Sequence, residues 1–289
     1  MKKGLALEGG AMRGMFTAGV LDVFMENGIS FDGAAGISAG ATFGCNLKSG
    51  QIGRVIRYNK RYCRDWRYGS FRSWILTGDL YGKKFCYETL PNELDPFDTK
   101  SYRETPMEFY FGTTNVDTGR PLFFRSRTGD ARDLTWMRAS ASMPVVSRVV
   151  EVDGYRLLDG GISDPVPLRF LKSRGYDRNV VLLTQPKGYR KQPSKLTPAI
   201  CFLLRKYPKT AHAMKVRYLR YNHQMDQIDR EEAEGKILVI RPPQALEIGS
   251  VCHEPEKLEQ VYQIGRAEGE RQLAAVRTFL QQQIPQPSA

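Results

Sequence analysis

The first 50 residues alternate twice between a short apolar run, a glycine-rich turn and a helical pattern. The first apolar run covers residues 3–8 and ends at two glycines. Over residues 15–27 apolar side chains recur at helical spacing, and a glycine follows as a helix stop. A second run over 31–36 leads into a helix predicted over 39–48. This alternation is typical of a parallel sheet covered by helices, so we expect an α/β fold.

Strand patterns continue along the rest of the chain. Further strands are predicted over residues 108–114, 120–124, 179–184 and 236–240. A hairpin is predicted over 151–158, because its central Asp153-Gly154 is a strong turn signal. No repeat or low-complexity linker precedes a polar tail from Gln281 onward. We therefore interpret residues 1–289 as one α/β domain with helical insertions and a helical C-terminal region.

The composition excludes several protein classes. Apolar residues make up 41% of the 289 and charged residues 26%, the balance of a globular chain. No apolar run approaches the ~20 residues of a membrane-spanning helix, and the N-terminal apolar stretch is too short for a signal peptide. We therefore expect a cytoplasmic protein. The five cysteines are scattered without a Cys-x-x-Cys pair, so neither a disulfide framework nor a zinc site is indicated.

The sharpest local signal is Gly36-Ile37-Ser38-Ala39-Gly40, between a predicted strand and a predicted helix. This Gly-x-Ser-x-Gly spacing is the nucleophile-elbow pattern, in which small residues allow a tight turn that exposes the serine. At a helix N-terminus the helix dipole and free N–H groups favour a developing negative charge. The other interpretation is a serine that only caps the helix in a glycine-rich turn.

A nucleophilic serine needs a base, and two kinds of candidate follow it along the chain. Asp159 ends the predicted hairpin strand, and Gly160-Gly161 behind it leave its side chain accessible. The alternative is an Asp-Gly-Gly turn that only ends a strand. The three histidines lie late in the chain in charged segments, where a surface or packing role fits better. They are His212, His223 and His253.

A glycine-rich loop separates the first strand from the first helix. Its residues are Gly9, Gly10, Ala11, Met12, Arg13 and Gly14. Successive N–H groups at a helix start form an anion-binding concavity, which suits a phosphate or the oxyanion of an acyl-transfer intermediate. As a dinucleotide-binding loop it is a poor match, because Ala11 stands at a glycine position and no acidic residue closes the second strand.

Taken in chain order, these motifs resemble the patatin-like phospholipase family. The matching residues are Gly9-Gly10-x-x-Arg13-Gly14, Gly36-x-Ser38-x-Gly40 and Asp159-Gly160-Gly161, with a softer likeness over 31–41 and 138–144. The resemblance covers about residues 4 to 170. It implies a three-layer α/β/α sandwich with a mostly parallel central sheet, followed by further strands and a helical C-terminal part over 171–289.

The resemblance also implies a chemistry. Such a protein cleaves acyl esters of lipids, as a phospholipase A or a lysophospholipase does, through a Ser–Asp dyad without histidine, metal or cofactor. Carried over by position, Ser38 is the nucleophile and Asp159 the general base. The loop over residues 9–14 is the oxyanion hole, with the N–H groups of residues 10–12 as donors. Ala11 replaces a glycine that the family often has; alanine still donates its N–H but tolerates a positive φ poorly.

The chain has 43 Lys and Arg but 31 Asp and Glu, so its net charge is +12. This excess of positive charge indicates anionic partners. Two segments, residues 54–74 and 205–221, mix cations with aromatic side chains. They fit an anionic membrane interface, with aromatics at headgroup depth. They also fit the phosphates and stacked bases of a nucleic acid. They also fit two amphipathic helices whose aromatics pack inward while the cations face water.

Three functions follow from these observations. The ordered motifs favour a serine acyl hydrolase with a lipid or acyl-ester substrate and peripheral contact with an anionic membrane, and no nucleic-acid partner is expected. A non-catalytic relative that binds an acyl lipid or a phosphate is the alternative that Ala11 keeps open. A nucleic-acid- or phosphate-binding protein would use the charge and the glycine loop but leaves Ser38 and Asp159 without a role.

Overall fold

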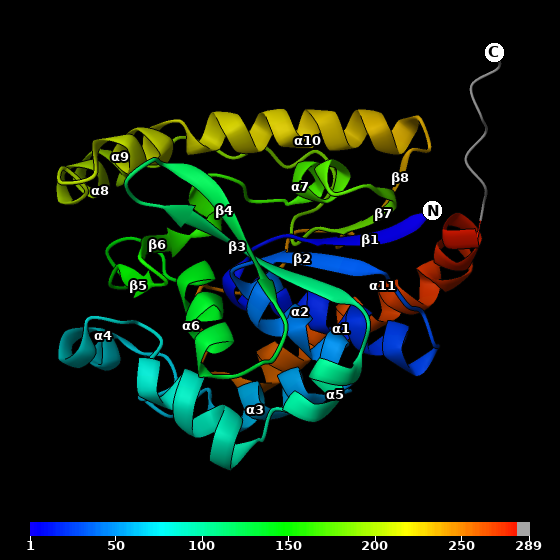
Figure 1. Cartoon of the computed structure of the whole chain (residues 1–289), viewed down its shortest axis with the longest axis horizontal. Helices are drawn as coiled ribbons and strands as arrows, with labels where there is room; N and C mark the ends of the chain where they lie inside the picture. Colours follow the sequence, from blue (N-terminus) through cyan, green and yellow to red (C-terminus); the bar gives the residue numbers. More distant parts are fainter. Residues whose placement is uncertain (282–289) are drawn as a thin grey trace.

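The computed structural model describes residues 1–281 and builds them around one eight-stranded sheet (Figure 1). Of the polar tail predicted from Gln281 onward, only Gln281 is among them. The strands are β1 (Lys2–Leu7), β2 (Gly33–Ile37), β3 (Glu108–Asn115), β4 (Arg120–Ser126), β5 (Val150–Val152), β6 (Tyr155–Asp159), β7 (Tyr176–Leu182) and β8 (Ile237–Ile240). Their order is β5-β6-β3-β2-β1-β7-β8, and β4 pairs with β3. β1, β2, β3, β7 and β8 run parallel, and β4, β5 and β6 add antiparallel pairs.

Helices cover both faces of the sheet. The helices are α1 (Gly14–Glu26), α2 (Ala39–Ser49), α3 (Arg54–Tyr62), α4 (Phe71–Thr77), α5 (Thr99–Glu104), α6 (Ala131–Ser140), α7 (Leu168–Ser173), α8 (Thr197–Leu203), α9 (Pro208–Lys215), α10 (Arg217–Ala233) and α11 (Pro255–Gln281). Two short 3₁₀ turns, η1 (Ala11–Arg13) and η3 (Gly160–Ile162), and a π-helical segment, η2 (Phe85–Leu94), complete the elements. In Figure 1, α7 and α10 lie above the sheet, and α1, α2, α3, α5 and α11 lie below it.

The alternation of strand side chains explains the two layers. Leu5 and Leu7 of β1 face the larger core, which α1, α2 and α11 close. Ala6, between them, faces the second core, which α7 and α10 close. Since successive residues of a strand point to opposite faces, a strand buried on both sides is apolar along its whole length. This is why β1 and β2 read as continuous apolar runs in the sequence.

Most elements expected from the sequence are present, with ends moved by one to three residues. The hairpin turns at Asp153-Gly154, where φ is +51° and +77°, as the Asp-Gly signal requires. The C-terminal part continues the same fold, because β8 extends the sheet beside β7 and α11 packs against α1. The basic segments are less uniform than two amphipathic helices. In the first, Tyr58 and Tyr68 are buried, but Trp66 and Phe71 are exposed.

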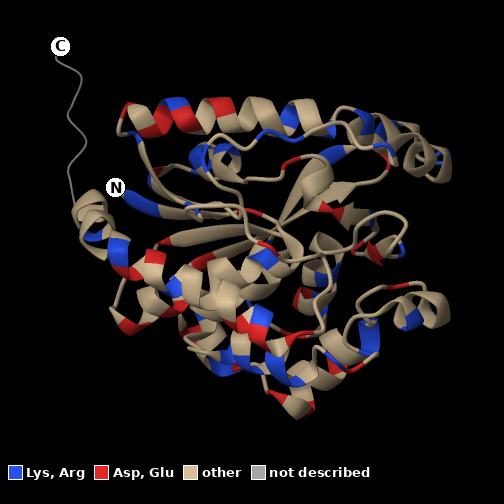
Figure 2. Ribbon diagram, turned by 180° about the vertical axis from the view of Figure 1, so that it is seen from behind, with Lys and Arg blue, Asp and Glu red and all other residues tan. Residues whose placement is uncertain are grey.

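Charged side chains mark the outer helices and loops, whereas the central strands carry few of them (Figure 2). α10 displays both signs along its length in this view. Among residues 1–281, no helix has the combination of length and apolar character needed to cross a membrane.

Candidate active site

Strand register brings the three sequence motifs together at one end of the central strands. The pairing of β1 with β2 places the loop after β1 beside Ser38, which follows β2 directly. β2 ends opposite Gly112 of β3, and the next β3 residue, Thr113, pairs with Asp159 at the end of β6. Ser38 and Asp159 therefore flank the same point of β3 although 121 residues separate them in sequence (159 − 38).

Ser38 occupies a strained turn between β2 and α2. Its φ of +54° and ψ of −118° lie outside the regions that an L-residue favours. The Ser38 carbonyl accepts hydrogen bonds from the N–H groups of Ala41 and Thr42, both at 2.9 Å. The side chain makes no capping hydrogen bond within the described chain, so it does not act as a side-chain cap of α2. The turn needs glycine on both sides, because a Cβ on Gly36 would lie 2.2 Å from the Gly40 carbonyl oxygen.

Asp159 is a buried carboxylate, and only one of its two oxygens has a hydrogen-bond partner among the described residues. It is 2% exposed, and its Oδ1 accepts the Gly161 N–H at 2.7 Å. Its Oδ2 has no hydrogen-bond partner among the described residues. Burial raises the pKa of Asp159 to about 6, against the lowering effects of the Gly161 N–H, the Ser38 side chain and the charges of Arg217 and Lys191. The Ser38 side chain is thus near enough to stabilise the carboxylate, although no hydrogen bond of ordinary geometry joins the two.

The glycine loop packs directly on Ser38. A Cβ on Gly9 would lie 3.1 Å from the Ser38 Cβ, a tight contact that a glycine avoids where the loop backbone packs on Ser38. The Gly9 N–H already donates to the Pro165 carbonyl at 3.4 Å, and the Arg13 N–H donates to the Gly10 carbonyl at 3.1 Å. Residues 10–12 lie between Gly9 and Arg13, and their N–H groups have no backbone acceptor within the described part of the chain. These three groups are the donors that the sequence predicts for an oxyanion.

Ala11 adopts the backbone conformation that glycine would adopt more easily. Its φ is +49°, one of four positive φ values at non-glycine residues in the described chain. The departure from the family pattern therefore falls at a position with a left-handed backbone. Ala11 and Met12 also line an apolar cavity beside Ser38. Arg13 ends η1, and Gly14, the last motif residue, begins α1.

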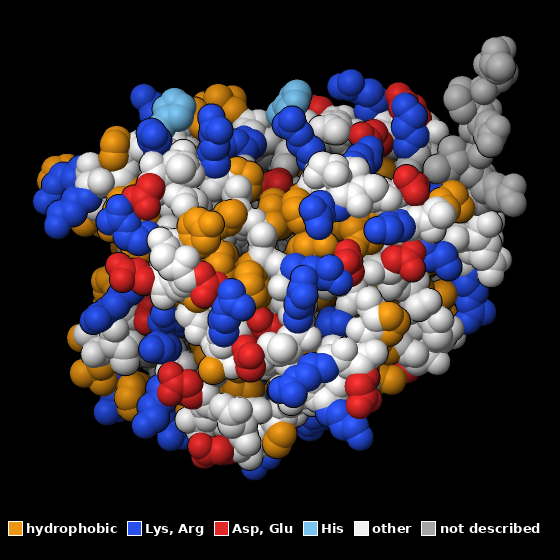
Figure 3. Space-filling model, in the orientation of Figure 1, with side chains coloured by type: hydrophobic (Ala, Val, Ile, Leu, Met, Phe, Trp, Pro, Cys, Tyr) orange, Lys and Arg blue, Asp and Glu red, His pale blue; other side chains and the backbone are white. Residues whose placement is uncertain are grey.

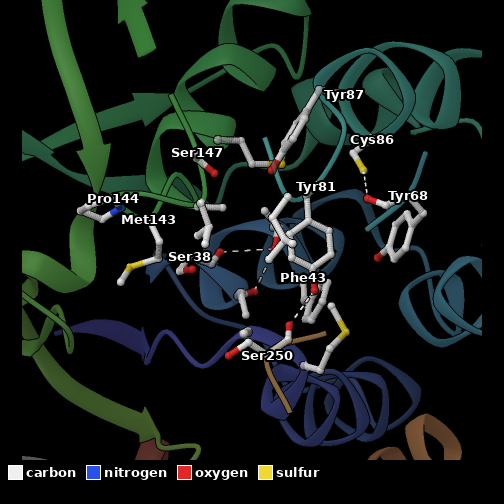
Figure 4. Close-up of a pocket in the computed structure, with 18 of the residues that line it drawn as sticks. Ser38, Phe43, Tyr68, Tyr81, Cys86, Tyr87, Met143, Pro144, Ser147 and Ser250 are labelled. Atoms are coloured by element: carbon white, nitrogen blue, oxygen red, sulfur yellow. Dashed lines mark hydrogen bonds between the residues drawn. The ribbon is translucent and has the colours of Figure 1, made fainter. Parts of the chain in front are cut away.

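A cavity of about 590 Å³ opens beside Ser38 (Figure 4). Its wall is almost entirely apolar and aromatic, and it is built by α2, η2, α6, α8 and the segment over residues 143–147. In Figure 4, Ser38 lies between Met143 and Tyr81, and Phe43 and Tyr87 close other parts of the wall. A cavity of this size and character suits a hydrocarbon chain better than a polar ligand.

Some residues that hold the site have no sequence signal. Ser140, at the end of α6, accepts the Ser38 N–H on its Oγ at 3.0 Å and donates to the Gly112 carbonyl at 2.6 Å. The Asp159 N–H donates to the Ser142 carbonyl at 2.8 Å. The segment around residues 138–144 resembles the family only softly, and only the fold shows that it braces both predicted catalytic residues.

A buried glutamate anchors the strand that precedes the glycine loop. Glu8 accepts hydrogen bonds from the Thr184 N–H at 2.6 Å and from the Tyr221 hydroxyl at 2.9 Å. The Thr184 side chain in turn lies against Gly10, where an added Cβ would be 2.6 Å from its Oγ1. The loop is therefore held from β7 and α10, far along the chain.

The side of Asp159 away from the cavity is cationic. Arg217 at the start of α10 donates from Nε to the Gly161 carbonyl at 2.6 Å. Burial, with the charges of Arg217 and Arg13, lowers the pKa of Lys191 to about 8. The Lys191 ammonium lies 4.8 Å from the centre of the Tyr221 ring. None of these three cations lines the apolar cavity.

The histidines lie apart from this site. His212, His223 and His253 are all exposed. His253 Nδ1 lies 2.5 Å from the Cys63 carbonyl oxygen, and no histidine contacts Ser38 or Asp159 among the hydrogen bonds of the described residues. A surface role therefore fits all three, as the sequence favours.

Comparison with known proteins places the fold and these motifs in one family. A family model described as Patatin-like phospholipase matches residues 5–172, more than half of the chain. The chain belongs to the patatin-like phospholipase family. Membership confirms the likeness carried by the three motifs and supports the expectation of a hydrolase. The expected patatin-like sandwich, with its mostly parallel sheet between helical layers, is also confirmed. A second model, Domain of unknown function (DUF6363), matches residues 207–281, which hold α10, β8 and α11.

The relatives of this patatin-like chain differ greatly in length. It is 26% identical to Lysophospholipase nte1 of Aspergillus oryzae, over 95% of this chain but 18% of that protein. It is 28% identical to the uncharacterised protein YjjU of Escherichia coli K12, over 97% of this chain and 80% of YjjU. The chain thus spans less than a fifth of the fungal protein. Among solved structures, VipD of Legionella pneumophila matches with a TM-score of 0.49 at 12% identity, over 95% of this chain and 67% of VipD.

Proposed function

We propose that this protein is a serine hydrolase of lipid acyl esters, with Ser38 as nucleophile and Asp159 as general base. One observation carries the proposal. Ser38, a buried carboxylate with a free oxygen and three unpaired N–H groups converge beside an apolar cavity. Family membership and the likeness to a lysophospholipase support the same reaction class.

The reaction follows from these positions. Ser38 Oγ attacks the ester carbonyl while Asp159 Oδ2 takes its proton, and the carbonyl oxygen becomes an oxyanion. The free N–H groups of residues 10–12 stabilise that oxyanion, and each donor contributes about 3–4 kcal/mol in well-studied cases. The proton on Asp159 passes to the leaving alcohol, which departs and leaves an acyl-serine. Asp159 then takes a proton from water, whose oxygen attacks the acyl carbon. As the bond between the acyl carbon and Ser38 Oγ breaks, Asp159 passes that proton to Ser38 Oγ, which releases the acid and restores both residues.

The raised pKa of Asp159 helps the carboxylate as a base. An aspartate of ordinary pKa near ~3.9 is a weak base for a serine hydroxyl. Burial brings the pKa of Asp159 to about 6, so the group is a stronger base yet is still mostly ionised at neutral pH. Because Oδ2 has no hydrogen-bond partner among the described residues, it can bind the proton from Ser38. The hydrogen bond from the Gly161 N–H to Oδ1 then stays intact.

The cavity indicates which part of the ester binds there. Phe43, Leu134 and Met137 are among its apolar lining residues, and the cationic side chains beside Asp159 lie outside it. We therefore assign the cavity to the acyl chain. The alcohol part of the ester then lies on the polar side of Ser38.

Hydrolysis of a short-chain p-nitrophenyl ester and of a phospholipid and lysophospholipid panel tests the proposal. We expect Ser38→Ala and Asp159→Asn each to lower kcat by about 10³-fold or more, because each removes a group that acts on the reacting atoms. A combined His212→Ala, His223→Ala and His253→Ala variant should keep wild-type activity. Equal activity of Ser38→Ala and wild type would refute the dyad.

A non-catalytic acyl-lipid-binding relative is the alternative, and the strained Ala11 is the observation that favours it. A fluorophosphonate probe separates the two, because it labels only a serine that is activated as a nucleophile. Labelling of wild type but not of Ser38→Ala supports the enzyme. Binding of a fluorescent fatty acid without labelling or turnover would support the binding protein.

A further inference from the structure

Two short helices expose large apolar side chains on the same side of the molecule. Figure 1 places α4 and α8 at its left edge, below and above the sheet. The exposed side chains are Phe71, Ile75 and Leu76 of α4 and Leu196, Phe202 and Leu203 at α8, each 57–67% exposed. Such side chains are normally buried, so their exposure on two helices at the same edge of the molecule calls for a partner that covers them.

This exposed surface runs into the cavity beside Ser38. Leu196 and Leu203 are exposed and also line the cavity. Val145, 39% exposed, lines it as well. Trp74 of α4 donates from Nε1 to the Val145 carbonyl at 2.8 Å, which ties α4 to this rim. The two helices thus flank the entrance through which an apolar molecule would pass to Ser38.

The sequence around α8 carries charge of one sign. No Asp or Glu stands between Asp177 and Asp226, and α8 lies within that stretch. In this stretch Lys187 and Arg190 form salt bridges. Four exposed cations near α8 form no salt bridge with the residues that the structure describes. They are Lys195, Arg205, Lys206 and Lys209.

The apolar and cationic groups lie next to each other at both helices. The Arg205 guanidinium lies 4.6 Å from the Phe202 ring centre, and on α4 the Arg72 guanidinium lies 4.6 Å from that of Trp66. Figure 3 shows hydrophobic side chains beside Lys and Arg at the left edge of the molecule, where Figure 1 places α8 and α4. Apolar side chains with a cationic rim are the combination that binds an anionic lipid surface.

We propose that α4, α8 and the segment over residues 143–147 form a docking face for a bilayer that contains anionic phospholipid. The apolar side chains enter the headgroup region, the cations contact lipid phosphates, and an ester passes from the bilayer into the cavity. This last step rests on the proposed acyl hydrolase, whereas docking itself does not. A nucleic acid fits the face less well, because aliphatic side chains such as Ile75 and Leu76 neither pair with phosphate nor stack on bases.

Vesicle binding by the Ser38→Ala protein tests docking without any turnover. The probes are vesicles of phosphatidylcholine alone and of phosphatidylcholine with phosphatidylglycerol, sedimented at about 0.05 M and about 0.5 M NaCl. We expect binding to the anionic vesicles at low salt and a clear loss at high salt. Ile75→Ser, Leu76→Ser and Phe202→Ser combined should weaken partitioning by about tenfold or more, because burial of one such side chain alone contributes about that factor.

Matched variants separate the docking face from general effects. Ile52→Ser with Leu219→Ser removes two exposed apolar side chains, 45% and 53% exposed, that do not line the cavity. Lys195→Glu with Lys206→Glu should weaken anionic binding strongly, since each basic group near such a surface contributes about fivefold. Lys100→Glu with Arg127→Glu, on the α5 side of the molecule, should leave it unchanged. Equal losses in the face variants and their controls would overturn the proposal.

A soluble ester distinguishes this failure from a failure of the proposed function. With active protein, the Ile75, Leu76 and Phe202 variant should hydrolyse a short-chain p-nitrophenyl ester at the wild-type rate but vesicle phospholipid about tenfold more slowly. Soluble hydrolysis without vesicle binding would refute docking alone. Vesicle binding without any hydrolysis would refute the enzyme alone. Binding of a single-stranded oligonucleotide by a protein that ignores vesicles would assign the cations to nucleic acid and overturn the docking face.

Discussion

Ser140 holds the backbone of Ser38: its hydroxyl accepts the Ser38 N–H at 3.0 Å and donates to the Gly112 carbonyl at 2.6 Å. Ser38 has a positive φ, a conformation that persists only where the surroundings enforce it. The hydrogen bond to Ser140 is one such constraint, and it connects Ser38 to both α6 and β3. A residue without catalytic chemistry thus helps to fix the position of the proposed nucleophile.

Ser140→Ala should reduce activity by misplacing Ser38. The variant leaves the Ser38 N–H without its partner in a buried position, which costs about 1–3 kcal/mol. We expect kcat on a p-nitrophenyl ester to fall about 10- to 100-fold, because a small displacement of the nucleophile has effects of this size. Ser142→Ala is the control, since among the described residues the Ser142 hydroxyl bonds only the Arg138 carbonyl of the preceding helix α6, at 2.8 Å. If both variants lose stability equally and neither loses kcat, Ser140 is only structural.

Ala11 gives a prediction about the oxyanion loop. Its φ of +49° strains an alanine by about 1–2 kcal/mol, whereas glycine is unstrained there but loses about 0.5–1 kcal/mol of conformational entropy. Ala11→Gly should therefore change the free energy of unfolding by no more than about 1 kcal/mol and keep kcat/KM. Ala11→Val adds a β-branched side chain at positive φ and should lower kcat/KM by about tenfold or more. Chemical denaturation and ester kinetics measure both. A sharp loss in the glycine variant would show that the loop depends on the Ala11 methyl group.

The sequence predicts Ser38, Asp159 and the glycine loop because each motif is local. A nucleophile elbow needs small residues within five positions, and an Asp-Gly-Gly turn needs three, so the pattern is visible without the fold. The same holds for β1, β2 and the Asp153-Gly154 hairpin, whose periodicity or turn residues are short-range. The local turns and strands that carry these motifs could therefore be predicted from the sequence, and the catalytic roles of Ser38 and Asp159 stay predictions.

The supports of the site were not predictable, because they reach it across long sequence distances. Ser140 contacts Ser38 from 102 residues away, and Tyr221 reaches Glu8 across 213. A serine at a helix end and a tyrosine in a basic sequence segment carry no local sign of these contacts. The cavity could not be predicted for the same reason, because its wall combines residues of α2, η2, α6 and α8, which lie far apart in the sequence. The exposed aromatics Trp66 and Phe71 show how weakly composition alone predicts burial in a mixed segment.

Asp159 predicts a pH dependence of activity. The carboxylate must be ionised to accept the Ser38 proton, and its pKa is about 6. We expect kcat/KM for a neutral ester to rise through pH 6 and to level off above about pH 7. A profile over pH 4–9 measures this, with the ester's spontaneous hydrolysis subtracted. A profile flat from pH 4.5 upward would mean that the base has an ordinary aspartate pKa.

The same group predicts a pH dependence of stability. The folded-state pKa of about 6 exceeds the usual 3.8, so the folded protein holds this proton more tightly than the unfolded chain. The resulting stabilisation is fully present below about pH 3.8 and is lost as the pH rises to 6. Relative to wild type, Asp159→Asn should therefore gain up to about 3 kcal/mol between pH 4 and pH 7. Urea unfolding of both proteins at several pH values measures the difference, and the comparison cancels the other groups that titrate, such as Asp164. A constant difference would contradict the raised pKa.

Arg217 connects helix α10 to Asp159, the proposed base. Its charge lowers the pKa of Asp159, and its Nε holds the Gly161 carbonyl at 2.6 Å. Arg217→Gln removes the charge, so the rise of kcat/KM with pH should move to higher pH. Activity at pH 6 should then fall about threefold or more while activity at pH 8 changes little. Arg217→Lys keeps the charge and should keep the wild-type profile. Arg220→Gln is the matched control, because Arg220 holds the Ile162 carbonyl from the same helix and is not among the charges that act on Asp159. A uniform loss at every pH in Arg217→Gln and Arg220→Gln alike would assign Arg217 to holding the turn and not to the electrostatics of the base.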